Sequence, residues 1–131
     1  MTGRQEQDFT LTPLVEDAEV ILRNVFFESG SADLSAQSEP ELREVSAWLA
    51  DNPGIRLEIG GHTDDVGSAK DNLALSAHRA EAVLEFLVAQ GADRDQLTAV
   101  GFGQTRPAVE GKSEAARRQN RRTTLRLISR D

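Results

Sequence analysis

Three polar side chains in the middle of the chain, Asp64, Asn72 and Arg79, have types and spacing that could form one binding site. Asp64 lies just beyond a predicted strand. Asn72 and Arg79 are seven residues apart, two turns along the same side of a predicted helix. A carboxylate binds an ammonium group, and a guanidinium binds a carboxylate through two parallel hydrogen bonds. This set therefore suits a zwitterion of the amino-acid type, which carries both charges on one carbon.

A structural role for the same residues is the first alternative. In this alternative, Asp64 caps the following helix and Arg79 forms an internal salt bridge. Structural ion pairs perturb charged groups just as functional sites do, so charge alone does not distinguish the two. The pattern by itself favours this structural interpretation.

Metal-dependent and enzymatic chemistry have weaker support in the sequence. His62, Asp64 and Asp65 carry donor atoms that metals use, but their spacing matches no established metal signature. Glu58 and Asp64, six residues apart along a strand, are too widely separated for the paired acids of a glycosidase. The absence of Cys excludes thiolate catalysis and Cys-ligated metals. We therefore expect no catalytic residue, no metal and no cofactor.

A strand–helix–strand unit is predicted to position these side chains. Residues 55–59 alternate apolar and polar side chains, as in a half-buried strand. A long helix is expected to begin near Ser68 and to end with a cap at Gly91. Its predicted apolar stripe consists of Leu73, Ala77, Ala80, Val83, Leu84 and Leu87. A strand at 97–100 follows, ended by a turn at 101–103.

The remaining elements flank this unit. Residues 19–27 are rich in β-branched and aromatic side chains and are predicted to form a strand. A helix is predicted to begin with a capping box at 38–41 and to stop at 52–54. Residues 104–119 are polar, with a helical turn at 114–119. In a last strand at 123–128, Leu125 and Leu127 are predicted to face inward, Thr124 and Arg126 outward.

The element order predicts an α/β (α+β) sandwich, with a mixed four-stranded sheet and two main helices on one face. The 131 residues, 38% of them hydrophobic, suffice for one core. We expect residues 1–18 to be a lead-in and residues 19–131 to form the domain. The first residues are too polar for a signal peptide, and no apolar run reaches membrane-spanning length. A protein that works outside the cytoplasm would therefore carry this chain as part of a larger precursor.

Charge is distributed unevenly along the chain. The net charge is −7, but residues 106–131 hold eight basic against three acidic residues, which leaves −12 on the rest. An acidic protein is a poor general binder of nucleic acid, because neutralisation of phosphates drives that binding. The basic run at 117–122 could serve a small anionic ligand or form salt bridges with neighbouring elements.

Two segments, Ile59–Gly67 and Asn72–Ala80, closely resemble the core motif of the OmpA-like family. This family is the C-terminal, peptidoglycan-binding domain of many envelope proteins of Gram-negative bacteria. Further similar motifs are Phe26-Phe27 with Leu34, Gly101–Pro107, and Arg117-x-x-Asn120-Arg-Arg122. The resemblance extends from about residue 21 to residue 128, and the ordered set of motifs is far more specific than any one of them.

The resemblance implies a non-catalytic cell-wall anchor that binds the diaminopimelate of the peptidoglycan stem peptide. Asp64 would pair with the ammonium and Arg79 would bind the carboxylate. The assisting residues would be Asn72, Thr63, Leu75, Gly30 and Arg121. Because family members often have Asp or Asn at the position of Gly30, only a backbone contact is expected from that loop. Thr124 also replaces a frequent acidic residue.

The resemblance also implies a location and partners. We expect a place on the periplasmic side of the outer membrane, in a larger envelope protein whose signal peptide is not in this chain. The expected partner is the stem peptide, with no nucleic acid and no membrane contact by this domain itself, and a homodimer is left open.

Two other classes of function stay open. One is a protein–protein module such as a dimerising stator-type domain. Exposed apolar surface on the helix that contains Trp48, and a concentration-dependent mass, would support it. The other is a peptidoglycan hydrolase, for which the sequence offers no Cys, no metal set and no suitably placed pair of acids.

Overall fold

The computed structural model describes residues 19–22, 25–27 and 31–130. The predicted lead-in and Gly30 lie outside the described residues. A four-stranded sheet has the order β1-β4-β2-β3. Its strands are β1 (Glu19–Leu22), β2 (Ile55–His62), β3 (Leu97–Gly103) and β4 (Arg122–Arg130). β2 and β3 are parallel, and β4 is antiparallel to both β2 and β1, so the sheet is mixed as predicted.

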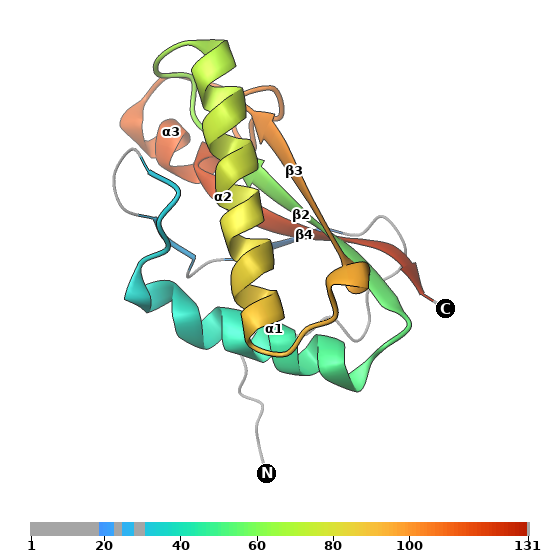
Figure 1. The fold of residues 1–131 in the computed structure, drawn as a ribbon. Coiled ribbons are helices and arrows are strands. Elements are labelled where there is room, and N and C mark those ends of the chain that lie inside the picture. The colour runs from blue at the N-terminus through green and yellow to red at the C-terminus, as the bar shows by residue number, and fades with distance from the viewer. Residues whose placement is uncertain (1–18, 23–24, 28–30, 131) are drawn as a thin grey trace.

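Two long helices lie on one face of this sheet (Figure 1). They are α1 (Glu39–Asp51) and α2 (Ala69–Ala89), and α2 connects the parallel strands β2 and β3. The predicted turn at 114–119 is a short third helix, α3 (Glu114–Asn120). Single turns of 3-10 helix occur at η2 (Ala36–Ser38) and η3 (Arg94–Gln96). Among the described residues, no helix is long and apolar enough to cross a membrane.

The hydrophobic core lies between the sheet and these two helices. Its side chains come from α1 and α2, where buried positions follow the helical spacing, and from β2 and β4, where the core side chains are two residues apart, as the sequence predicted. The fully buried ones are Leu42, Val45, Leu49, Leu57, Ile59, Val83, Leu87, Leu125 and Leu127. Burial of each such side chain contributes about 1.5–3 kcal/mol, so this layer fixes α2 against the sheet.

Close contact between α2 and the sheet depends on glycine. A Cβ at Gly61 would lie 2.2 Å from the carbonyl oxygen of Ser76, and a Cβ at Gly101 would lie 2.3 Å from the amide nitrogen of Ala77. The turn predicted at 101–103 is wrong, because β3 continues to Gly103, where φ reaches +57°. Because Gly61 and Gly101 have no side chains, the first half of α2 can pack directly on the carboxyl ends of β2 and β3.

The predicted ends of α2 are confirmed. The Ser68 side chain accepts a hydrogen bond from the amide of Asp71 at 3.0 Å, and Gly91 has a φ of +116° directly after the last helical turn. The predicted apolar stripe is wrong at Leu73, whose exposed fraction is 49%. Here the backbone of α2 rests on Gly103, because a Cβ on that glycine would lie 3.1 Å from the Cα of Leu73. This contact leaves no space for a leucine side chain beneath the helix.

The segment before α1 differs from the prediction. β1 ends at Leu22, short of the predicted end at residue 27, and Phe27 pairs only through an isolated bridge. The predicted capping role of Ser38 is also wrong. Its hydroxyl accepts a hydrogen bond from the amide of Phe26 at 2.6 Å and donates one to the Phe26 carbonyl at 2.8 Å. These bonds fix Phe26 at the start of α1, beside the site described next.

Candidate functional site

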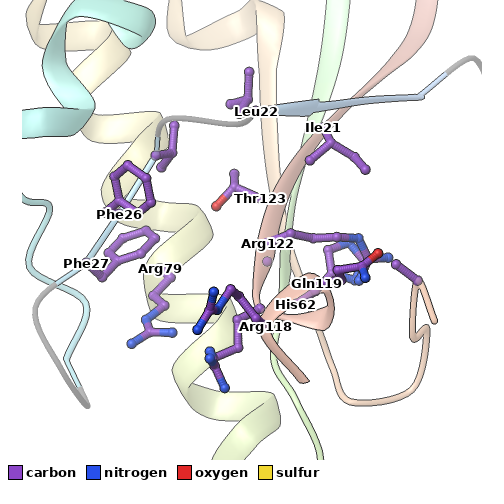
Figure 2. A pocket seen from close by; sticks show the side chains of 14 residues that line it. Ile21, Leu22, Phe26, Phe27, His62, Arg79, Arg118, Gln119, Arg122 and Thr123 are labelled. Carbon is purple, nitrogen blue, oxygen red and sulfur yellow. The ribbon is translucent and has the colours of Figure 1, made fainter. Parts of the chain in front are cut away.

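A cavity of about 700 Å³ lies where β1, the end of β2, α2 and α3 meet (Figure 2). Part of its wall is apolar and part is cationic. The apolar side chains include Ile21, Phe26 and Phe27, and the cationic ones are Arg79, Arg118, Arg121 and Arg122. Of the predicted site residues, Arg79 and Arg121 line the cavity, and Asp64 is connected to it through Arg121.

Arg79 reaches the cavity from α2 and is half-buried. Its Nε donates to the carbonyl oxygen of Ser31 at 2.8 Å, and its guanidinium carbon lies 4.9 Å from the ring centroid of Phe27. Burial lowers the pKa of Arg79, the positive charge of Arg121 lowers it further, and Asp64 opposes both. No carboxylate of the described residues lies within ion-pair distance, so the predicted internal salt bridge is absent there. The terminal amino groups keep donors for an incoming carboxylate.

Asp64 follows β2, and its carboxylate is held from two sides. Oδ2 accepts a hydrogen bond from Nη1 of Arg121 at 2.6 Å, and Oδ1 accepts one from the amide of Val66 at 3.0 Å. Arg121 also donates to Glu114 at 2.8 Å, which connects Asp64 to α3. Asp64 does not cap α2, because Ser68 does, so this part of the structural alternative is wrong. A carboxylate offers about four acceptor positions, which leaves room for another donor at Asp64.

Asp65 is the second carboxylate after β2, and α3 also holds it. Its oxygens accept hydrogen bonds from Arg117 at 2.9 Å and Lys112 at 3.0 Å. These two hydrogen bonds, that of Arg117 first, lower the pKa of Asp65 to about 2. Within the described part of the chain, no group of three or more His, Asp or Glu is placed to hold a metal ion.

Asn72 and Thr63 shape the loop that carries Asp64. The Asn72 amide nitrogen donates to the carbonyls of Asp64 at 3.3 Å and Val66 at 3.0 Å, and to the side chain of Gln104 at 2.9 Å. The Thr63 hydroxyl donates to the Asp64 carbonyl at 2.9 Å. Both side chains are buried. Their hydrogen bonds therefore set the position of the Asp64 backbone.

Leu75 lies on α2 one turn before Arg79 and is partly exposed. It is not among the residues that line the cavity. The structure thus brings Arg79 and Arg121 together in the cavity wall and connects Asp64 to this wall through Arg121. Asn72 contacts the backbone of Asp64 and not its carboxylate.

His62, the last residue of β2, is buried in the cavity wall. Its Nε2 lies 3.2 Å from the Thr124 hydroxyl, and its ring stacks on Phe102 with centroids 5.1 Å apart. Its Nδ1 has no hydrogen-bond partner among the described residues. Burial, then Arg122 and Arg106, lower the pKa of His62 to about 4, so the ring is neutral at pH 7. Thr124, predicted to face outward, is only 1% exposed, because this end of the sheet is covered.

The sequence did not indicate Arg118 or Phe26 as cavity residues. Helical spacing does not group Arg118 with Arg121 and Arg122, because α3 ends at Asn120 and Arg122 is the first residue of β4. The contacts of Phe26 are long-range and leave no local pattern.

The model of the OmpA family matches residues 26–121, which include both segments that position Asp64 and Arg79. The chain belongs to the OmpA family. This OmpA-family domain is 38% identical over 96 residues to the peptidoglycan-associated lipoprotein of Legionella pneumophila. The match covers 73% of this chain and 54% of that protein, so the chain spans about half the length of this relative.

Solved structures agree with this assignment. The domain is similar to the crystal structure of the peptidoglycan-associated lipoprotein from Burkholderia pseudomallei, with 34% identity and a TM-score of 0.71. That comparison covers 79% of this chain and 86% of the other. A putative MotB like protein from Desulfovibrio vulgaris has 28% identity and a TM-score of 0.75, over 86% of this chain and 74% of the other. The family and fold class predicted from the motifs are confirmed.

Proposed function

We propose that this OmpA-family domain binds peptidoglycan non-covalently through the diaminopimelate of the stem peptide. It would thereby anchor a larger envelope protein to the cell wall, on the periplasmic side of the outer membrane. The proposal is supported by the names of its relatives from Legionella pneumophila and Burkholderia pseudomallei, which are both peptidoglycan-associated lipoproteins. Binding requires no catalytic residue and no cofactor.

The observation that carries the proposal is the state of Arg79. Its guanidinium is half-buried, lines the cavity, and has no carboxylate within ion-pair distance among the described residues. Contacts to Ser31 and Phe27 fix its plane without using the terminal amino groups. A ligand carboxylate can therefore accept two parallel hydrogen bonds from a cation that is already oriented.

Asp64 supplies the opposite charge for the ammonium of the same headgroup. The bonds from Arg121 and Val66 hold its carboxylate in place, and its negative charge raises the pKa of Arg79 against the effect of burial. A zwitterion matches this arrangement, because each end meets the opposite charge. We assign Asn72 and Thr63 to the positioning of Asp64, since their polar groups are engaged with the loop.

Co-sedimentation with purified cell walls tests this proposal. Wild type should sediment with diaminopimelate-type walls and much less with lysine-type walls, and free meso-diaminopimelate should compete. Asp64→Asn should remain in the supernatant, whereas Asp51→Asn, an exposed change on α1, should bind like wild type. Equal binding to both wall types would contradict the assignment of diaminopimelate. Loss of turbidity of the wall suspension would indicate a hydrolase.

The alternative of a dimerising module predicted exposed apolar surface on the helix of Trp48. In the structure Trp48 is partly buried against the core. The exposed large apolar side chains of the described residues lie elsewhere, at Ile21, Phe26, Val66, Leu73 and Ile128. Sedimentation velocity between micromolar and millimolar concentrations distinguishes the two functions. A constant monomer mass is expected for a wall anchor of this kind.

A further inference from the structure

Three arginines around the cavity form no ion pair with a carboxylate of the described residues. Arg79 donates to the Ser31 carbonyl, and Arg122 donates to the carbonyls of Asn120 and Arg106. Arg118 is exposed on α3 and lines the same cavity. Only the fourth arginine, Arg121, forms ion pairs there, with Asp64 and Glu114. A chain with 22 acidic and 15 basic residues thus keeps an excess of positive charge in one place.

Two of these arginines, Arg79 and Arg122, are partly buried, and burial disfavours their charged form. Burial lowers the pKa of both Arg79 and Arg122, the expected sign for a guanidinium that has lost part of its hydration. Arg122 and Arg106 also help to keep the neighbouring ring of His62 neutral. Asp64 opposes the effect of burial at Arg79, and Glu19 opposes it at Arg122. Neither carboxylate lies within ion-pair distance of that arginine. Partly desolvated cations that form no ion pair are stabilised by an anion that enters their site.

A second, independent observation points to the same place. His62 lines the cavity, is 3% exposed, and has a buried Nδ1 without a hydrogen-bond partner among the described residues. Unsatisfied polar atoms of this kind are rare and are expected where a ligand or water completes the structure. Figure 2 shows Arg79 and Arg118 reaching toward the same part of this cavity from different helices.

We propose that Arg118 and Arg122 form a second anion subsite, which binds a further carboxylate of the peptide whose zwitterionic headgroup lies between Asp64 and Arg79. This inference rests on the proposed function. The volume of about 700 Å³ exceeds what one amino-acid headgroup needs. The apolar wall at Ile21 and Phe26 suits short aliphatic parts of a peptide. The domain therefore binds a peptide that carries at least two separated carboxylates, and the headgroup alone fills only part of the cavity.

Two synthetic tripeptides test the second subsite. The first is L-Ala-γ-D-Glu-meso-diaminopimelate, and the second is identical except that the D-glutamyl α-carboxylate is amidated. Wild type should bind the acid about fivefold more tightly than the amide, the difference expected of one partly exposed ion pair. Free meso-diaminopimelate, measured in parallel, reports the headgroup site separately. Inorganic phosphate serves as a competing anion.

Arg118→Gln should remove the preference for the acid and leave binding of free meso-diaminopimelate unchanged. This side chain is exposed and forms no hydrogen bond or ion pair with the described residues, although its charge helps to lower the pKa of Glu114, so the fold should not depend on it. Arg43→Gln, the same loss of charge on the exposed side of α1, should keep the preference. Arg122→Lys preserves the positive charge and should therefore keep most of the preference for the acid tripeptide.

Equal affinity of wild type for the two tripeptides, with normal binding of free meso-diaminopimelate, would overturn the second subsite and leave the proposed function standing. Failure of wild type to bind all three ligands would instead contradict the proposed function, and the subsite with it. Displacement of the peptide by phosphate at equal potency would assign these arginines to phosphate and overturn the carboxylate assignment.

Discussion

The carboxylate of Asp64 accepts a hydrogen bond of 2.6 Å from the guanidinium of Arg121, which lies 57 residues later in the sequence. Arg121 also donates to Glu114, the first residue of α3, so its side chain connects the loop after β2 to the start of α3. Asp64, which we propose binds an ammonium group, has its Oδ2 held in place by the guanidinium of Arg121. We therefore propose that Arg121 affects ligand binding through the position of Asp64.

Replacement of Arg121 tests this positioning role. Arg121→Ala should weaken binding of meso-diaminopimelate about three- to tenfold, because one charge-assisted hydrogen bond no longer orients Asp64. The free energy of unfolding should change by less than about 1 kcal/mol, since the pair is partly exposed. Arg117→Ala is the matched control. It removes the same charge, but Arg117 donates its hydrogen bond to Asp65 and not to Asp64. Equal loss of affinity in both variants would indicate a general charge effect.

Asn72 should affect both stability and binding. Asn72→Ala removes the donor shared by the carbonyls of Asp64 and Val66, at a cost of about 2 kcal/mol in urea unfolding. Affinity should fall as well, because the loop that carries Asp64 loses its anchor. Asn52→Ala removes a similar hydrogen bond to the carbonyl of Trp48, and should lower stability without a change in affinity. Unchanged affinity in Asn72→Ala would refute the positioning role.

The glycines beneath α2 should tolerate no side chain. Gly61→Ala and Gly101→Ala each place a Cβ within 2.3 Å of the helix backbone, which cannot move as a flexible side chain does. Each should lower the free energy of unfolding by about 3 kcal/mol. Gly91→Ala, where only the positive φ is strained and no atom lies within 4 Å, should cost about 1 kcal/mol. Wild-type stability of Gly61→Ala would mean that α2 does not contact the sheet there.

The stability of the domain should fall between pH 6.5 and pH 4 because of His62. The pKa of His62 is lowered from 6.5 to about 4 in the folded state. As the pH falls below 6.5 the unfolded chain takes up a proton that the folded chain does not, so up to about 3 kcal/mol is lost. Urea unfolding of wild type and His62→Gln at several pH values measures this. His62→Gln should lose most of the slope, whereas His78→Gln, at an exposed histidine, should keep it.

An equal slope in wild type and His62→Gln would contradict the buried, neutral state of His62. The contribution of Asp65 belongs to a separate, more acidic range. Its folded pKa is lowered from 3.8 to about 2, so its stabilisation is lost only as the pH falls through that range.

The local parts of the fold were predictable from the sequence. Ser68 and Gly91 mark the ends of α2 by their own chemistry, and the alternation at 55–59 identifies β2 without reference to the rest of the chain. The local pattern also placed Asp64 after β2 and Arg79 on α2, and the resemblance to a known family supplied their roles in the binding of diaminopimelate. Their roles toward a ligand stay predictions.

Long-range contacts explain what the sequence did not predict. The motif at Ser38 has the residues of a capping box, but its hydroxyl bonds to Phe26, 12 residues earlier. Leu73 follows the helical period, yet the contact of α2 with Gly103 leaves its side chain outside. Arg118 lines the same cavity as Ile21 and Leu22 of β1, a long-range arrangement that no local pattern encodes.

A calorimetric titration with meso-diaminopimelate tests whether Arg79 binds a ligand carboxylate. Wild type should bind saturably, and Arg79→Ala should bind at least about tenfold more weakly, because a guanidinium–carboxylate pair contributes about 1.5–3 kcal/mol. Arg79→Lys should recover only part of the affinity, since an ammonium cannot offer two parallel hydrogen bonds. Circular dichroism and urea unfolding should show that both variants are folded, with Arg43→Ala as the control. Wild-type affinity in a folded Arg79→Ala, or no binding by wild type, would contradict the account.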